Sequence, residues 1–254
     1  MKGRLFLVPT PLDHGCAEQT PLDDVLPLGT IKKAAAIACW ISENAKSTRA
    51  FLKRVDAVAP LAQPIQAQQI TELPREVHKK GDHAGAARFD ARPLLAPALQ
   101  GQDVGLISEA GMPAVADPGS SVVRAAHQLG IEVLPLTGPV SLLLALAASG
   151  LNGQNFAFIG YLPQDASART TQIQQISRAV QQSGQTRIVI ETPYRNQVLL
   201  EALLSGLDGQ LRLCVASGLT LPDADGARSA SVAEWRQARW PVTPKAPAVF
   251  LIGR

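Results

Sequence analysis

The segment LISEAGMPAVADPG, residues 106–119, contains the residue types that shape ligand-binding turns. It follows a short apolar run, Asp103 to Ile107, that predicts a strand, and it precedes a helical pattern that begins at Ser120. Glycine permits backbone geometry and close approach that other residues forbid. Loops at the carboxyl ends of strands are where open α/β sheets bind ligands. An ordinary Gly/Pro-rich connection is the alternative, and the segment alone does not decide between the two.

A second turn of this kind is Thr137-Gly138-Pro139-Val140-Ser141. It lies between a predicted strand, Ile131 to Leu136, and an apolar helix, Val140 to Ala148. Pro139 suits a first helical turn, and the N–H groups of the new helix could bind a carboxylate or a hydroxyl. A plain strand-to-helix turn is equally consistent. The chain has neither a G-x-G-x-x-G fingerprint nor a P-loop, which disfavours a dinucleotide site of the Rossmann type.

Metal and nucleophile chemistry find little support in the sequence. The four histidines, His14, His78, His83 and His127, share no ligand spacing, so we expect no metal site. A G-x-S-x-G elbow is absent, which argues against an α/β-hydrolase. Cys214 lies in a predicted strand and is expected to be inert core.

Composition favours an α/β protein. Apolar residues make up 46% of the 254 residues but aromatic ones only 4%, and small aliphatic side chains suit close packing of helices on sheets. Three scattered cysteines, Cys16, Cys39 and Cys214, have no disulfide spacing and indicate a reducing, cytoplasmic setting. No run approaches the roughly 18 apolar residues of a membrane span, so we expect a soluble protein without a membrane partner.

The net charge of +3 is small, but basic residues form two groups. Solvated helix faces are one interpretation, and a surface for phosphate or another anionic partner is the other. Neither group is interleaved with aromatic residues, so no stacking platform for single-stranded nucleic acid is indicated. The two groups are Lys32, Lys33, Lys46, Arg49, Lys53 and Arg54, and then His78, Lys79 and Lys80.

Short apolar runs alternate with helical patterns along the chain, which predicts parallel-sheet α/β architecture. Two such series suggest two α/β lobes, residues 1–137 and 138–254, with an approximate boundary. A helix is predicted over Ser47 to Val55, with Ser47 or Thr48 as its cap. Pro60 to Ala87, rich in Gln, Pro, Gly and charge, is expected to be a long mobile connection apart from a possible strand near Gln69 to Thr71.

Six motifs, in this order, resemble the tetrapyrrole methylase superfamily: VPTP, LISEAGMPAVADPG, PLTGPVSLLLAL, FIGYLP, IETPYR and APAVFLIGR. The chain is most similar to the branch of ribosomal RNA small subunit methyltransferase I, which methylates a cytidine ribose hydroxyl. The resemblance implies a two-lobed α/β fold, a homodimer, and S-adenosyl-L-methionine bound in a cleft between the lobes.

The resemblance also implies which residues bind this cofactor. Backbone contacts are expected from the Gly111 turn, and contacts with the methionine portion from the Gly138 turn. Later strands would contribute from the second lobe and help to enclose the adenine. The matching positions are Pro9, Ser108, Ala110, Gly111, Met112, Val115, Val140, Ser141, Glu191, Thr192, Leu219, Thr220, Pro247 and Ala248.

Departures from the branch concern the acceptor. Its Ala-Glu-Asp-Thr-Arg signature is replaced here by the stretch Ser42 to Arg49, in which Glu43 keeps its place. Met112 stands where Thr is typical, Ser108-Glu109 replaces Ser-Asp, and Tyr194-Arg195 replaces His-Arg. These changes weaken the transfer of the ribosomal substrate to this chain, although they leave the cofactor geometry untouched.

Methyl transfer to a hydroxyl requires a base and correct positioning. Glu43 is the candidate base, and Arg195, Lys46 or Arg49 could position a phosphate, although each could instead form a structural ion pair. The expected activity is methylation of RNA, with ribosomal RNA as the acceptor. The alternatives are methylation of a tetrapyrrole or another small molecule, and a non-catalytic S-adenosylmethionine-binding sensor or assembly protein.

Overall fold

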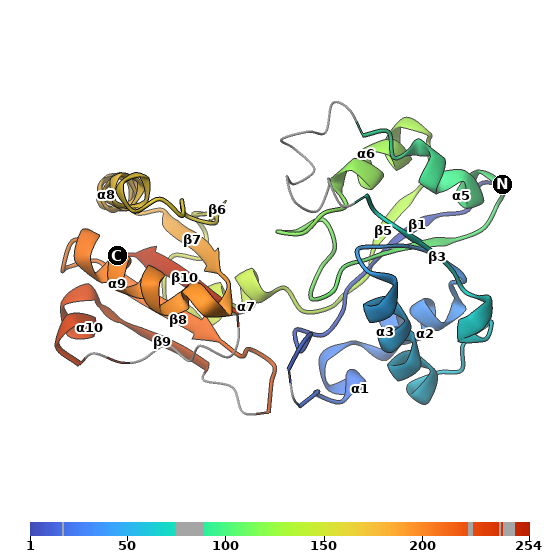
Figure 1. The fold of residues 1–254 in the computed structure, drawn as a ribbon, viewed down its shortest axis with the longest axis horizontal. Helices are drawn as coiled ribbons and strands as arrows, with labels where there is room; N and C mark the ends of the chain where they lie inside the picture. Colours follow the sequence, from blue (N-terminus) through green and yellow to red (C-terminus); the bar gives the residue numbers. More distant parts are fainter. Residues whose placement is uncertain (17, 75–88, 223–225, 239, 241–246) are drawn as a thin grey trace. The chain divides into compact units, whose positions relative to one another are not determined.

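The computed structural model of this chain describes residues 1–16, 18–74, 89–222, 226–238, 240 and 247–254 (Figure 1). The chain divides into two compact units, Met1–Pro139 and Val140–Arg254. Each unit is built on its own five-stranded sheet with helices packed against it. The predicted α/β class is therefore confirmed.

The sheet of the first unit is entirely parallel, with the strand order β3-β2-β4-β1-β5. All four residues of β2 and of β4 are buried, which explains their unbroken apolar character. The strands are β1 (Leu5–Val8), β2 (Cys39–Ser42), β3 (Gln69–Glu72), β4 (Val104–Ile107) and β5 (Val133–Pro135).

Helices cover both faces of this sheet (Figure 1). Phe6, Val8 and Trp40 pack on one face with α1 (Leu22–Val25), α2 (Leu28–Ala36) and α3 (Ala45–Val58). Side chains of alternate strand residues, such as Leu5 and Ile41, pack on the opposite face. That face is covered by the 3₁₀ helix η2 (Arg92–Leu95), α5 (Ala96–Leu99) and α6 (Ser120–Gln128).

The connections that leave β1 and β4 run in opposite directions. From β1 the chain passes through α1 and α2 to β2, on the far side of β4, whereas from β4 it passes through α6 to β5, on the far side of β1. The two connections also lie on opposite faces of the sheet. The carboxyl ends of β1 and β4 therefore form a topological switch point, where open α/β sheets bind ligands.

The sheet of the second unit is mixed, with the strand order β6-β7-β10-β8-β9. β6 and β7 are parallel, but the other pairs are antiparallel, so the prediction of a parallel sheet is wrong here. The connection between β8 and β9 is too short for a crossover helix, which requires the two strands to be antiparallel. The strands are β6 (Phe156–Gly160), β7 (Thr186–Glu191), β8 (Arg212–Ser217), β9 (Gly226–Ser231) and β10 (Ala248–Gly253).

Helix α7 (Ser141–Ser149) covers one face of this sheet, where Leu142, Ala145 and Leu146 pack against β7, β8 and β10. The other face is covered by α8 (Ala166–Ser183), α9 (Asn196–Gly206) and α10 (Val232–Ala238), as Figure 1 shows. The short 3₁₀ helix η3 (Pro193–Arg195) leads into α9. Among the described residues, no helix combines the length and the apolar character that crossing a membrane requires.

Two local predictions need correction. Helix α3 begins at Ala45 and is capped by Asn44, whose side chain accepts from the N–H groups of Lys46 and Ser47, so Ser47 and Thr48 are not the cap. Their hydroxyls instead donate back to the Asn44 carbonyl.

The predicted mobile connection, Pro60 to Ala87, contains a 3₁₀ helix, η1 (Ile65–Ala67), that was not predicted. The strand predicted within it near Gln69 to Thr71 is confirmed as β3. The remainder of the connection from residue 75 lies outside the described residues, as do the basic group His78 to Lys80 and His83.

Replacing Gly105 by Ala should destabilise the first unit. A Cβ at Gly105 would lie 2.6 Å from Cε3 of Trp40, which is buried and donates from Nε1 to Oε1 of Gln68 at 3.0 Å. Because the ring must shift in a packed core, we expect a loss of about 1–3 kcal/mol in urea unfolding.

The matched control is Gly29→Ala in α2, where no atom lies within 4 Å of the added Cβ. This helical substitution should leave stability unchanged or raise it by up to about 1 kcal/mol. Equal unfolding midpoints for Gly105→Ala and the wild type would contradict the packing described for Trp40.

Candidate functional site

The loops that follow β1 and β4 are joined by a pair of backbone hydrogen bonds. The Thr10 N–H donates to the Gly111 carbonyl at 2.9 Å, and the Gly111 N–H donates to the Thr10 carbonyl at 3.0 Å. The Thr10 hydroxyl also donates to the Ser108 carbonyl at 3.3 Å. Gly111 has a φ of +77°, a conformation that other residues rarely adopt. The two loops are thus held against each other at the switch point.

The loop after β5 comes equally close. A Cβ at Gly138 would lie 2.3 Å from Cγ of Pro9, and one at Gly111 would lie 3.3 Å from Cδ2 of Leu12. The three loops can approach one another this closely because a glycine, which has no Cβ, lies at each of these contacts. We name the residues 9–12, 108–119 and 137–139 the strand-end cradle.

Two alanines of the cradle have left-handed backbone conformations. Ala114 has a φ of 65° and Ala116 a φ of 64°. Each costs roughly 1–3 kcal/mol, and such strain concentrates at ligand sites. Val115 lies between them with 41% of its surface exposed, so the strained turn presents an apolar side chain to solvent. These features are what a ligand-contacting loop requires.

Three carboxyl groups gather at the ends of β2 and β4. Oε2 of Glu43 accepts the backbone N–H of Glu109 at 3.3 Å. The pKa of Asp117 is raised to about 7, first by burial and then by the charges of Glu43 and Glu109, whereas a hydrogen bond with Ser108 opposes the shift. Asp117 therefore changes charge near neutral pH, a property that is common at functional sites.

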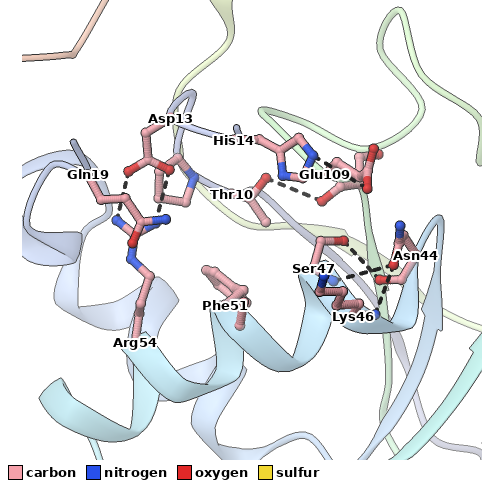
Figure 2. Close-up of a pocket in the computed structure, with 13 residues that line it drawn as sticks. Thr10, Asp13, His14, Gln19, Asn44, Lys46, Ser47, Phe51, Arg54 and Glu109 are labelled. Carbon is pink, nitrogen blue, oxygen red and sulfur yellow. Dashed lines mark hydrogen bonds and ion pairs between the residues drawn. The ribbon is translucent and has the colours of Figure 1, made fainter. Parts of the chain in front are cut away.

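A cavity of about 350 Å³ lies beside the cradle (Figure 2). Helix α3 forms one wall, the loop after β1 another, and the start of the loop after β4 a third. It shares Thr10, Pro11, Ser108 and Glu109 with the cradle. The lining residues are Thr10, Pro11, Asp13, His14, Gln19, Asn44, Lys46, Ser47, Ala50, Phe51, Arg54, Ser108 and Glu109.

An ion pair fixes the loop after β1 against α3. Nη1 and Nη2 of Arg54 lie 3.0 and 2.9 Å from the two carboxylate oxygens of Asp13, whose side chain is only 4% exposed. Nη2 of Arg54 also donates to the Thr20 carbonyl at 2.6 Å. Next to Asp13, the ring of His14 faces Glu109, with Nε2 3.6 Å from Oε1 (Figure 2).

Sequence reasoning assigned no role to Asp13, His14 or Asp117. It noted Glu109 only as part of the Gly111 segment, and Arg54 only as part of a basic group. Glu109 and Asp117 lie within the motif of residues 106–119, where acidic residues beside glycine turns were the available signal. The pairing of His14 with Glu109 joins residues far apart in sequence and had no local signal.

The structure brings the predicted cofactor residues of the first unit together in the cradle. They are Pro9, Ser108, Ala110, Gly111, Met112 and Val115. Glu43, the predicted base, lies at the end of β2 and holds the Glu109 N–H, but it does not line the cavity. Lys46 lines the cavity, whereas Arg49 does not and instead lies near the Ala45 carbonyl on α3.

The predicted residues of the second unit gather at one end of its sheet. In the register of β10, Ala248 lies opposite Glu191 of β7 and Ser217 of β8. Pro247 precedes this row, Thr192 follows Glu191, and Leu219 and Thr220 follow Ser217. Val140 and Leu219 both pack against the apolar cluster beneath α7, whose first residue is Ser141. Thr220 has a φ of 72°.

Arg195 pairs with a buried carboxylate of the same unit. Its Nη2 lies 3.1 Å from Oε2 of Glu191, and Oε1 of Glu191 accepts from the Thr192 N–H at 2.9 Å. The negative charge of Glu191 is thereby balanced by the guanidinium of Arg195. This geometry is what a structural ion pair requires, one of the two roles that the sequence leaves open for Arg195.

Comparison with known proteins shows the family. The sequence pattern of the Tetrapyrrole (Corrin/Porphyrin) Methylases matches residues 28–229. The chain is 34% identical to ribosomal RNA small subunit methyltransferase I of Pseudomonas aeruginosa over 86% of its own length and 67% of the relative's. It is 30% identical to the protein of the same name from Halalkalibacterium halodurans, over 80% of this chain and 60% of the relative. The chain therefore belongs to the tetrapyrrole methylase family, and it spans about two thirds or less of these relatives' lengths.

A solved structure shares the fold. Uroporphyrin-III C-methyl transferase from Thermus thermophilus, in complex with S-adenyl homocysteine, aligns with a TM-score of 0.54 at 19% identity. The alignment covers 99% of this chain and 98% of that one. At this identity the likeness concerns the fold alone, and it confirms the predicted tetrapyrrole-methylase-like architecture.

Replacing Asp117 by Asn should flatten the pH dependence of stability. Because folding raises the pKa of Asp117 to about 7, the folded state holds one proton more than the unfolded state between about pH 4 and 7. The wild-type free energy of unfolding should therefore fall by up to about 1.4 kcal/mol per unit as pH rises through this window. Urea unfolding at a series of pH values measures the slope.

The exposed Asp24 on α1 provides the control, since Asp24→Asn should keep the wild-type slope. A slope that Asp117→Asn leaves unchanged would show that this carboxyl group is not protonated near neutral pH.

Proposed function

We propose that this chain is an S-adenosylmethionine-dependent methyltransferase whose acceptor is a ribose hydroxyl of small-subunit ribosomal RNA. The strand-end cradle is the observation that carries this proposal, because its strained, glycine-dependent loops lie at the switch point of a sheet, where open α/β sheets bind ligands. Membership of the tetrapyrrole methylase family supports the class of reaction. The names of the two relatives support the class of acceptor.

The residues of the cradle fit the proposed cofactor. The left-handed turn at Gly111 lets a ligand approach the backbone closely, and the exposed Val115 offers apolar contact. The carboxyl groups of Glu109 and Asp117 within the cradle, and of Glu43 beside it, suit a sulfonium cation. The candidates of the second unit, from Val140 to Ala248, stay proposed contacts on the strength of the motifs.

When bound, S-adenosylmethionine supplies an activated methyl group for an in-line displacement. The chain must then hold an acceptor in line and remove its proton. The cavity of about 350 Å³ shares four residues with the cradle, Thr10, Pro11, Ser108 and Glu109, so a group bound there lies next to the proposed cofactor site. Its size falls at the lower end of the range for small-ligand pockets and suits one nucleoside unit.

Partner and location follow from the same proposal. The second unit exposes Leu143, Leu144, Phe156 and Phe158, and large apolar side chains at a surface favour a protein contact. We assign this contact to a homodimer. Ribosomal RNA as substrate places the protein in the cytoplasm.

Ribosomal RNA from cells with and without the gene tests the acceptor. Mass spectrometry of small-subunit RNA nucleosides should show one ribose methylation that is lost without the gene. The purified chain with S-adenosylmethionine should restore it in vitro.

Unchanged RNA nucleosides would contradict the RNA proposal. Transfer to a tetrapyrrole precursor would then identify a small-molecule methylase, an alternative favoured by the altered stretch Ser42 to Arg49. Cofactor binding without transfer to RNA, tetrapyrrole or protein would identify a non-catalytic binding protein.

A further inference from the structure

We propose that His14, oriented by Glu109, accepts the proton of the acceptor hydroxyl in the cavity beside the cradle. This inference rests on the proposed methyl transfer to a hydroxyl group. It assigns the base to the loop after β1, whereas the base expected from the sequence is Glu43, after β2.

The position of His14 is fixed by its neighbours in the chain. Asp13, the preceding residue, is buried in its two-contact ion pair with Arg54 of α3. Asp13 also accepts the Thr20 N–H at 3.2 Å, so both ends of the loop segment are held. His14 itself is 47% exposed in its side chain and lines the cavity. The anchored Asp13 is thus followed directly by a ring that a ligand can reach.

Glu109 orients the imidazole ring. Nε2 of His14 lies 3.6 Å from Oε1 of Glu109, so a hydrogen on Nε2 faces the carboxylate and the lone pair resides on Nδ1 (Figure 2). This separation exceeds that of a hydrogen bond, and such catalytic pairs often tighten when ligand binds. Glu109 is itself held through its backbone N–H by Glu43 at 3.3 Å. Glu43 is therefore a positioning residue in this arrangement.

The other groups that line the cavity are less suited to accept a proton. Asp13 is engaged by both nitrogens of Arg54, and Asn44 caps α3. The hydroxyl of Ser47 donates to the Asn44 carbonyl, and that of Thr10 to the Ser108 carbonyl. Among the lining residues that the structure describes, His14 and Glu109 can take a proton without breaking such an ion pair.

The proton transfer balances without a further reactant. The hydroxyl proton moves to Nδ1 of His14 while the oxygen lone pair forms the bond to the methyl carbon. The electron pair of the broken carbon–sulfur bond stays on sulfur, and the imidazolium later releases its proton to water. The carboxylate of Glu109 stabilises the imidazolium, and Glu43 and Asp117 are the acidic groups near Glu109. The other charged groups that line this cavity are Lys46 and the Asp13–Arg54 ion pair.

Nuclear magnetic resonance tests the contact without any turnover. The protein with ¹⁵N-labelled histidine has four imidazoles, and the His14 signals are identified by their loss in His14→Gln. Cytidine added to the protein saturated with S-adenosylhomocysteine should shift the His14 signals more than 2′-deoxycytidine does. The signals of His127, exposed on α6, should stay in place. Fixed His14 signals, or equal shifts with the two nucleosides, would overturn the proposal.

Kinetics test the proton transfer itself. Single-turnover methylation of small-subunit ribosomal RNA by His14→Gln should be slower by about 10²-fold or more, with unchanged cofactor affinity and unfolding midpoint. The single-turnover rate of the wild type should rise with pH, and this rising limb of the pH–rate profile should be absent from His14→Gln. Added imidazole should restore part of the rate to His14→Ala. His127→Gln, the matched control, should behave as the wild type.

Two further variants separate His14 from its acidic neighbours. Asp117, with a pKa of about 7, could itself produce a pH-dependent limb, so Asp117→Asn must keep the limb that His14→Gln lacks. Glu43→Gln should lower the rate less than His14→Gln does and keep the limb. A His14→Gln rate within a few-fold of the wild type, with the same limb, would overturn the assignment.

The two proposals fail in different ways. A wild-type chain that transfers no methyl group to RNA refutes the proposed function, while the nucleoside titration still decides whether His14 contacts a ribose hydroxyl. A wild-type chain that methylates RNA, with His14 signals that do not move, refutes the present inference alone.

Discussion

The backbone pairing between Thr10 and Gly111 is the contact on which the rest of the site depends. It exists because β1 and β4 are adjacent and parallel, so their carboxyl ends emerge at the same edge. Their connections then leave in opposite directions, which keeps the edge open above the strands. Glycines 111 and 138 allow the three loops to meet at backbone distance. The position of the cradle thus follows from the strand order of the sheet.

The charged side chains of the site come from the helix and loops that follow the strands at this edge. Helix α3 starts directly after β2 and supplies Arg54, whose ion pair with Asp13 fixes the loop after β1. That loop supplies His14, and the loop after β4 supplies Glu109, so the two strands joined by the backbone pairing also join these side chains. Asp117 is raised in pKa to about 7, first by its burial and then by the charges of Glu43 and Glu109. The cradle and the side chains of His14, Glu109 and Asp117 therefore all belong to the loops that follow β1 and β4.

Much of the first unit could be predicted from the sequence, because its strands are buried runs and its turns carry glycine. The strand over Asp103 to Ile107, the turn after it and the helix from Ser120 all have such signals, and the structure confirms them. Strand β9 has the sequence GARSAS, with neither apolar alternation nor branched side chains, and it was not foreseen. The mixed order of the second sheet was missed because strand direction depends on connections and not on periodicity.

The composition of the site was predictable only in part. The cradle follows from Gly111 and Gly138 because backbone requirements leave a local trace in sequence. The pairing of His14 with Glu109 and the pKa of Asp117 depend on packing between distant segments, for which one sequence carries no local sign. The cap of α3 by Asn44 shows the same limit at short range, since Asn44, Ser47 and Thr48 all have the chemistry of a cap.

The central claim is that the strand-end cradle binds S-adenosylmethionine, and isothermal titration calorimetry tests it most directly. The wild-type chain should bind S-adenosylmethionine saturably at one site per chain. Gly138→Ala, whose Cβ would lie 2.3 Å from Pro9, should weaken binding by about tenfold or more, or about 1.4 kcal/mol. Gly153→Ala, where no atom lies within 4 Å, should bind as the wild type does. No saturable binding by the wild type, or equal affinity in a folded Gly138→Ala, would contradict the account.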